Sequence, residues 1–116
     1  MSVSTRSGFD AALGALGGVT FVDQWEARVA KVGGKVFCLL SDAAPHRMTL
    51  KCGENSFDIL TALEGIDQAP YFAKRQWVSV TPGALPDDDL LAYAARSHAI
   101  VAAGLTKKLR TELGIA

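Results

Sequence analysis

The chain has 116 residues, of which 49% are hydrophobic and 21% are charged, which excludes a disordered chain and fits a single domain over residues 1–116. Its 12 basic and 12 acidic side chains cancel, which counts against a dedicated nucleic-acid-binding protein unless the basic residues cluster. The apolar runs are too short to span a bilayer, and the N-terminus lacks a signal-peptide core, so we expect a cytoplasmic protein without a membrane partner.

The first predicted element is a helix that begins at a Thr5 or Ser7 cap and ends near Leu16, because its apolar residues recur at helical spacing. From residue 19 onward the apolar residues instead alternate with polar ones, as in a strand. Asp23 interrupts this alternation, which predicts a bend or bulge near Gln24. The apolar row contains Val19, Phe21, Trp25, Ala27 and Val29.

Residues 29–52 predict three consecutive strands around which the rest of the chain is organised. Gly33-Gly34 separates two β-rich runs, 29–32 and 35–40, and predicts a tight hairpin, because both central positions of a type I′ turn need a positive φ. The second run is apolar on both faces after its first residue, as in a central strand. The third run alternates strictly, which predicts a half-buried strand with one solvated face. Its apolar row is Met48, Leu50 and Cys52, and its polar row is Arg47, Thr49 and Lys51.

The second half of the chain predicts a short helix, two strands and a long helix. The short helix runs from an Asn55 or Ser56 cap through Leu63. Residues 66–74 form an extended loop or a short edge strand, because Pro70 cannot donate a hydrogen bond to a ladder. Residues 77–80 form the last strand.

The last helix is predicted to start at Pro86, where three aspartates complement the helix dipole, and to be followed by a short basic helix near residues 107–110. Its buried stripe is predicted to be Leu90, Ala94, Ser97, Val101 and Leu105. The element order is therefore helix, three strands, helix, two strands, helix. It predicts an α+β fold, α-β(3)-α-β(2)-α in two layers, with one antiparallel sheet and the helices on one face.

Several short pieces, in this order and spacing, resemble the MmcQ/YjbR family of small bacterial proteins. The pieces are Trp25, Lys31-Val32-Gly33-Gly34-Lys35-Val36-Phe37, Leu50-Lys51-Cys52, Lys74 with Trp77-Val78, and Leu85-Pro86-Asp87 followed by Leu90 and Ser97. The resemblance implies the same two-layer fold, similar to that of secretion chaperones, and a double-wing DNA-binding motif.

The chain departs from the family pattern at two places. Some members have His-x-Asn-Lys-x-His-Trp before the late strand, where residues 71–77 read Tyr-Phe-Ala-Lys-Arg-Gln-Trp, so only the lysine and the tryptophan are kept. The Ser-Tyr pair common on the last helix is Ser97-His98. If the missing polar residues form a site in relatives, this chain has lost much of it or takes a different ligand.

The solvated sheet face is the predicted binding surface, because strand pairing would gather basic side chains there for phosphate contact, with the Gly-Gly hairpin as a wing. The candidates are Lys31, Lys35, Arg47, Lys51, Lys74 and Arg75, with the aromatic residues Trp25, Tyr71 and Trp77 beside them. The alternative is an ordinary solvated face whose lysines discourage edge pairing, with aromatic residues that belong to the core.

No residue pattern predicts catalysis. Ser97 and His98 are adjacent on a helix and point about 100° apart, so they cannot form a triad. Cys38 and Cys52 lack zinc-ligand spacing and are expected to be buried, reduced thiols. The three aspartates after Pro86 are explained by the helix dipole. We therefore expect a non-enzymatic protein with no cofactor and no metal, monomeric or homodimeric, whose partner is DNA or, alternatively, a protein or peptide.

Overall fold

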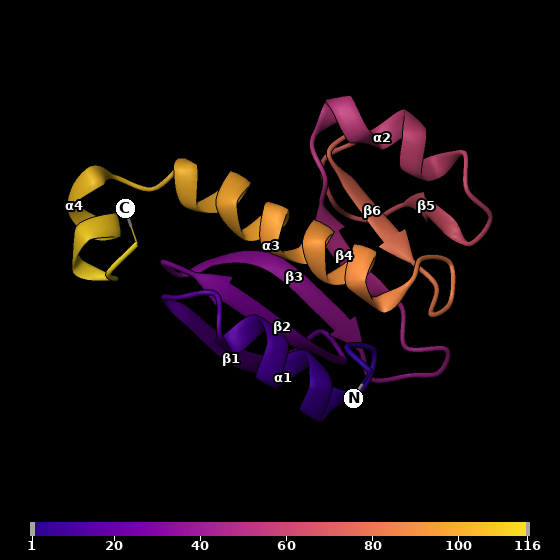
Figure 1. Cartoon of the computed structure of the whole chain (residues 1–116), viewed down its shortest axis with the longest axis horizontal. Helices are drawn as coiled ribbons and strands as arrows, with labels where there is room; N and C mark the ends of the chain where they lie inside the picture. The colour runs from indigo at the N-terminus through magenta and orange to yellow at the C-terminus, as the bar shows by residue number, and fades with distance from the viewer. Residues whose placement is uncertain (1, 116) are drawn as a thin grey trace.

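The computed structural model describes residues 2–115 and has the predicted α+β class, with one antiparallel sheet and helices packed against it. The six strands lie in the order β1-β2-β3-β4-β6-β5 (Figure 1). The strands are β1 (Val19–Gln24), β2 (Ala27–Val32), β3 (Lys35–Ser41), β4 (Met48–Lys51), β5 (Ile66–Gln68) and β6 (Trp77–Val80). The helices are α1 (Arg6–Gly14), α2 (Glu54–Thr61), α3 (Asp87–Ala103) and α4 (Lys107–Glu112).

Two tight hairpins join the first three strands, and they use different residues. The predicted Gly33-Gly34 turn is confirmed, with φ values of 58° and 79°. The bend predicted near Gln24 is instead a complete reversal, in which Trp25 and Glu26 both have φ of 55° and Gln24 pairs with Ala27. The chain therefore has four strands before α2, one more than predicted. Trp25 does not continue the apolar row of β1 and is 65% exposed.

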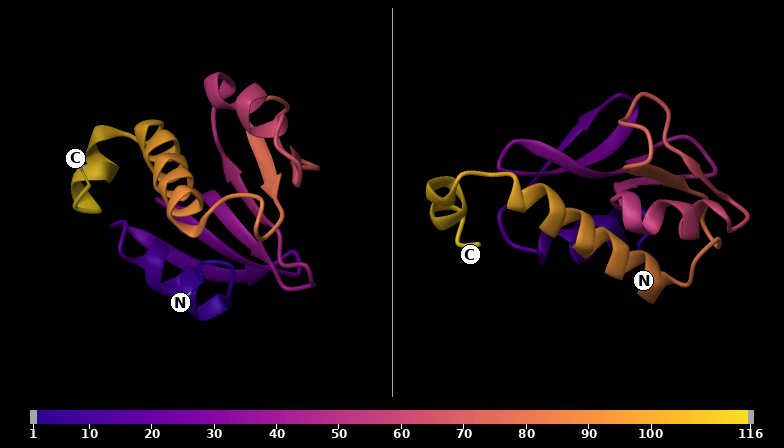
Figure 2. Two further views of the ribbon diagram at one scale, coloured as in Figure 1. Left: turned by 45° about the vertical axis from the view of Figure 1, so that its right-hand side comes forward. Right: turned by 90° about the horizontal axis from the view of Figure 1, so that it is seen from above.

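The covered face of the sheet is built by the apolar rows that the sequence predicted. Leu40, Met48, Val80 and Ile66 are aligned across four strands and are buried under the helices. Figure 2 shows α3 in the angle between the two halves of the curled sheet. The predicted buried stripe is confirmed, since Leu90, Ala94, Ser97 and Val101 of α3 are buried, and so is Leu105, which lies just beyond the end of the helix.

The last helix packs at the tip of the β2–β3 hairpin. A Cβ built on Gly33 would lie 2.7 Å from Leu105 Cδ1 and 3.2 Å from Leu109 Cδ2, whereas one built on Gly34 would meet nothing within 4 Å. One side of this tip is therefore packed against apolar side chains, and only the other side is open.

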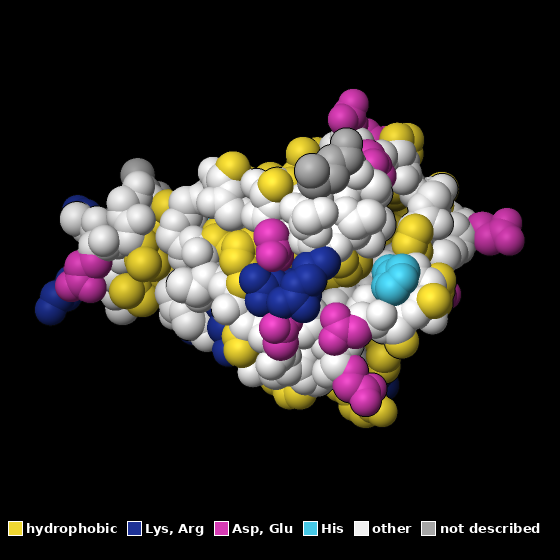
Figure 3. Space-filling model, turned by 90° about the horizontal axis from the view of Figure 1, so that it is seen from below, with side chains coloured by type: hydrophobic (Ala, Val, Ile, Leu, Met, Phe, Trp, Pro, Cys, Tyr) yellow, Lys and Arg dark blue, Asp and Glu magenta, His cyan; other side chains and the backbone are white. Residues whose placement is uncertain are grey.

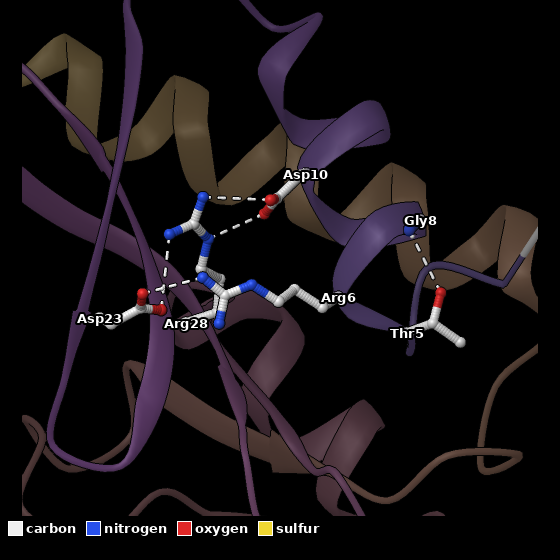
Figure 4. A network of polar contacts seen from close by, with 6 residues as sticks. All are labelled: Thr5, Arg6, Gly8, Asp10, Asp23 and Arg28. Carbon is white, nitrogen blue, oxygen red and sulfur yellow. Dashed lines mark hydrogen bonds and ion pairs between the residues drawn. The ribbon is translucent and has the colours of Figure 1, made fainter.

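A charge network ties α1 to the first hairpin. Arg28 on β2 donates to both carboxylate oxygens of Asp10, at 3.0 and 3.1 Å, and to Asp23 at 3.4 Å, while Arg6 donates to Asp23 at 2.8 Å (Figure 4). In Figure 3, which shows this side of the molecule, the basic side chains near the centre are bordered by acidic ones. The network thus leaves no uncompensated basic patch here.

The second helix ends earlier than predicted. α2 stops at Thr61, so Leu63 lies beyond it and is exposed rather than part of its buried face. The cysteine prediction is confirmed, since Cys38 and Cys52 are both free and buried. None of the helices within residues 2–115 is long and apolar enough to cross a bilayer.

Candidate ligand groove on the open face of the sheet

The face opposite the helices is defined by strand register. Val29, Leu39, Thr49, Ser79 and Asp67 are aligned across β2, β3, β4, β6 and β5, and paired residues point to the same side of a sheet. The sequence predicted that this side would be solvated. Instead, Val29, Thr49 and Ser79 are buried, and the β1–β2 turn and two loops lie beside Thr49 and Ser79 on this face.

These segments enclose a groove of about 660 Å³, a volume in the range of ligand-binding sites. Its floor is the sheet face, and its walls come from the β1–β2 turn, the loop after β3 and the loop after β5. The lining residues are Trp25, Leu39, Ser41, Ala43, Ala44, Pro45, Arg47, Thr49, Pro70, Tyr71, Phe72 and Ser79. The lining is mainly apolar and aromatic, with hydroxyl groups and one arginine.

Two aromatic side chains of the groove are exposed on strained backbone. Trp25 is 65% exposed, Tyr71 is fully exposed, and their φ values are 55° and 69°. A left-handed conformation costs a residue with a side chain about 1–2 kcal/mol and is uncommon outside glycine, asparagine and aspartate. Strained residues of this kind cluster at binding and active sites. The placement of both rings at the groove therefore marks it as a candidate site.

The third aromatic candidate supports the groove from beneath. Trp77 is buried on β6, and its ring lies 4.5 Å from that of Phe72, centroid to centroid. Because Phe72 belongs to the same loop as Tyr71, this packing holds the loop over the open face. Trp77 is thus buried, as expected if the aromatic residues belong to the core, whereas Trp25 and Tyr71 are exposed.

Arg47 is the cationic group of the groove, and its guanidinium is held on the sheet. Its Nε donates to Ser79 Oγ at 2.8 Å, and its Nη2 donates to the Ser79 carbonyl oxygen and to Asp67, both at 3.1 Å. Arg47 and Ser79 therefore give the groove polar groups in fixed positions, and Asp67 balances the charge of the arginine.

The six basic candidates do not all come together. Lys31, Arg47 and Lys51 share the open face, since Lys31 lies two residues from Val29 and both Arg47 and Lys51 lie two residues from Thr49. The other three lie elsewhere: Lys35 at the β2–β3 hairpin, Lys74 exposed in the β5–β6 loop, and Arg75 turned toward α2. Arg75 donates to Asp58 at 3.0 Å and lies over the Phe57 ring, and the bond to Asp58 raises the pKa of Arg75.

Sequence reasoning did not find the rest of the groove. Pro45 and the hydroxyl residues of the floor carry no pattern that singles them out. The sequence does signal the 70–72 segment through its proline and aromatic residues, but it predicts only an extended loop or a short edge strand there. What makes these residues a site is the folding of two loops over the sheet.

The residues considered for catalysis serve the structure. Ser97 Oγ bonds to the backbone of β3 and β4, and His98 Nε2 lies 2.8 Å from the Gly17 carbonyl oxygen. Burial raises the pKa of the Cys38 thiol far above its ordinary value, which keeps it protonated. Within residues 2–115, no three His, Cys, Asp or Glu side chains gather as a metal site.

Comparison with known proteins places the chain in a family. The family model described as YjbR matches residues 14–100. The crystal structure of the Deinococcus radiodurans protein DR2400, described with domain DUF419, is similar over 97% of this chain and 89% of that chain, with a TM-score of 0.87 and 25% identity. No curated protein sequence matches the chain. The chain belongs to the YjbR family.

Proposed function

We propose that this protein is a non-enzymatic adaptor that holds a segment of another protein in the open-face groove. The observation that carries the proposal is the exposure of Trp25 and Tyr71 beside a fixed Arg47. Tryptophan, tyrosine and arginine dominate the energetic centres of protein–protein interfaces. Exposing two such rings on strained backbone is unfavourable for an unbound fold, which supports a role for both rings in binding a partner.

The charge distribution ranks a protein segment above DNA as the ligand. Four arginines form ion pairs with aspartates: Arg6, Arg28, Arg47 and Arg75. DNA binding at physiological salt depends on cations that neutralise phosphates. A neutral, aromatic groove gains more from burying apolar side chains than from meeting phosphates.

Peptide selection tests the proposal. Full-length protein is used to select displayed random peptides, with counter-selection on the double variant Trp25→Ala, Tyr71→Ala. The selected peptides are expected to bind the wild type and to lose about tenfold or more in affinity on Trp25→Ala. Ile59→Ala is the matched control, because Ile59 is an apolar residue on α2 that is 67% exposed. It is expected to leave binding unchanged.

Two outcomes contradict the proposal. One is a selection that yields no peptide dependent on Trp25 or Tyr71. The other is a homodimer in light scattering that Trp25→Ala converts to a monomer, because the groove would then be an interface between copies.

DNA is the second candidate ligand, and a separate observation favours it. Lys31 and Lys51 lie on the open face, where Lys51 is aligned with Trp77, so a nucleic acid would find cations on the same sheet face as the aromatic groove. Fluorescence anisotropy with single- and double-stranded oligonucleotides at about 50 mM salt checks this. Binding that falls steeply with salt and is lost on Lys31→Glu with Lys51→Glu supports DNA. Absence of binding at this salt concentration removes it.

A further inference from the structure

The floor of the groove limits how a peptide can be held. Leu39, Thr49 and Ser79 lie on β3, β4 and β6, and each of these strands has a neighbour on both sides. Their backbone groups face the adjoining strands, so the groove offers no free strand edge. A peptide cannot add to the sheet here as an extra strand. It must be held by side chains.

The rings on the walls carry hydrogen-bond donors. The Trp25 indole has an N–H and the Tyr71 phenol an O–H, and neither group donates a hydrogen bond to another residue within 2–115. An exposed ring with a donor at its edge favours a ligand that combines apolar surface with carbonyl acceptors. An α-helix uses most of its carbonyls internally, whereas a polyproline II segment has no internal hydrogen bonds and leaves them all available.

The charged residues at the groove do not favour a ligand of either sign. Arg47 is neutralised by Asp67 at 3.1 Å and donates to Ser79 through two nitrogens. A phosphorylated or acidic peptide would meet the Asp67 carboxylate beside this cation, which reduces the gain from pairing with it. The groove is therefore complementary to an uncharged segment.

We infer that the groove takes an uncharged, proline-rich segment in the polyproline II conformation. Trp25 and Tyr71 serve as stacking platforms, and their N–H and O–H groups donate hydrogen bonds to the carbonyl oxygens of the segment. This inference rests on the proposed adaptor function and specifies its ligand. Such a segment is extended before it binds and loses little conformational entropy. Aromatic-lined grooves are the recurring way in which proteins bind it.

The test uses full-length protein labelled with ¹⁵N and an acetylated, amidated decaproline peptide. The indole signal of Trp25 is expected to shift on titration, and that of buried Trp77 to move less. Trp25→Ala is expected to weaken binding about tenfold or more. Tyr71→Phe, which removes only the hydroxyl donor, should weaken it about threefold to tenfold. Ile59→Ala on α2 should have no effect. An uncharged glycine–serine peptide and an amphipathic helical peptide are the ligand controls.

The titration and the peptide selection together show whether the polyproline inference or the adaptor function itself is wrong. An unmoved Trp25 signal at about 5 mM decaproline, or binding that is insensitive to both Trp25→Ala and Tyr71→Phe, overturns the inference. Preference for the helical peptide does so as well. If selected peptides without proline bind through Trp25, the adaptor function stands and only the ligand class falls. If no peptide binds through Trp25, both fall.

Discussion

Ser97 on α3 donates a hydrogen bond to the carbonyl oxygen of Phe37 on β3, and the same hydroxyl accepts one from the Lys51 N–H of β4 at 2.8 Å. The two strands are in register only from Cys38 and Leu50 onward, because β3 has a bulge near Phe37. A helix side chain thus occupies the place where the ladder between the strands is interrupted. The bulge in β3 is tolerated because Ser97 of α3 makes the hydrogen bonds that the backbone groups of Phe37 and Lys51 do not make with each other.

Replacing Ser97 with alanine should therefore destabilise the fold although the side chain lost is small. A buried N–H and a buried carbonyl would both lose a partner, which predicts a decrease of about 2–3 kcal/mol in the free energy of unfolding. Urea denaturation measures it. Ser7→Ala, at an exposed position of α1, is the control and should change stability by less than about 0.5 kcal/mol. Equal stability of the Ser97 and Ser7 variants would mean that water replaces the hydroxyl.

The Gly33-Gly34 turn provides a matched pair of substitutions. Both glycines have positive φ, so alanine at either position costs about 1 kcal/mol in backbone strain. At Gly33 the new Cβ also meets Leu105 at 2.7 Å, whereas at Gly34 it meets nothing within 4 Å. Gly33→Ala should therefore cost about 1–2 kcal/mol more than Gly34→Ala in urea denaturation. Equal costs would show that the leucines of the C-terminal segment give way freely.

The two hairpins differ in whether their turns can be predicted from the sequence. Gly33-Gly34 was predictable because glycine relieves the strain that a type I′ turn imposes, and the residue type reveals the turn. Trp25-Glu26 also has two positive φ values but lacks such residues, so the sequence predicts only a bend or bulge near Gln24 within one strand. The fold class survived this error, because the covered face depends on apolar rows that the alternation does reveal.

The groove could not be predicted because it depends on contacts between distant residues. Arg47 reaches Ser79, 32 positions away, and Phe72 packs on Trp77 to bring the 70–72 loop over the sheet. Periodicity reports which face of an element is buried, not which loop folds over the other face. Arg75 is a further example, since its bond to Asp58 turned a predicted member of the basic surface toward α2.

The network around Asp23 predicts a pH dependence of stability. The hydrogen bond from Arg6 lowers the pKa of Asp23 below its ordinary value. The unfolded state therefore binds more protons at this carboxyl, which has a pKa of about 3.9 when unfolded. Its stabilising contribution is present above that pH and is lost as the pH falls through the lowered folded-state pKa.

Asp23→Asn should accordingly lower the urea midpoint at pH 7 and reduce the loss of stability between about pH 5 and pH 2. The two proteins should converge at the acid end. Glu64→Gln, at an exposed position after α2, is the control and should keep the wild-type pH profile. Parallel profiles for wild type and Asp23→Asn would contradict the assignment.

The Trp25-Glu26 turn predicts that stability and binding can be moved in opposite directions. Replacing the pair with Asn-Gly supplies the residues that a type I′ turn favours, so the free energy of unfolding should rise by about 1–2 kcal/mol. The same change removes the exposed indole from the groove and should weaken decaproline binding about tenfold or more, as Trp25→Ala does. Urea denaturation and the decaproline titration measure the two effects on one protein. A variant that loses stability would mean that Trp25 is held by packing rather than strained for a ligand, and the functional interpretation of this turn would then be wrong.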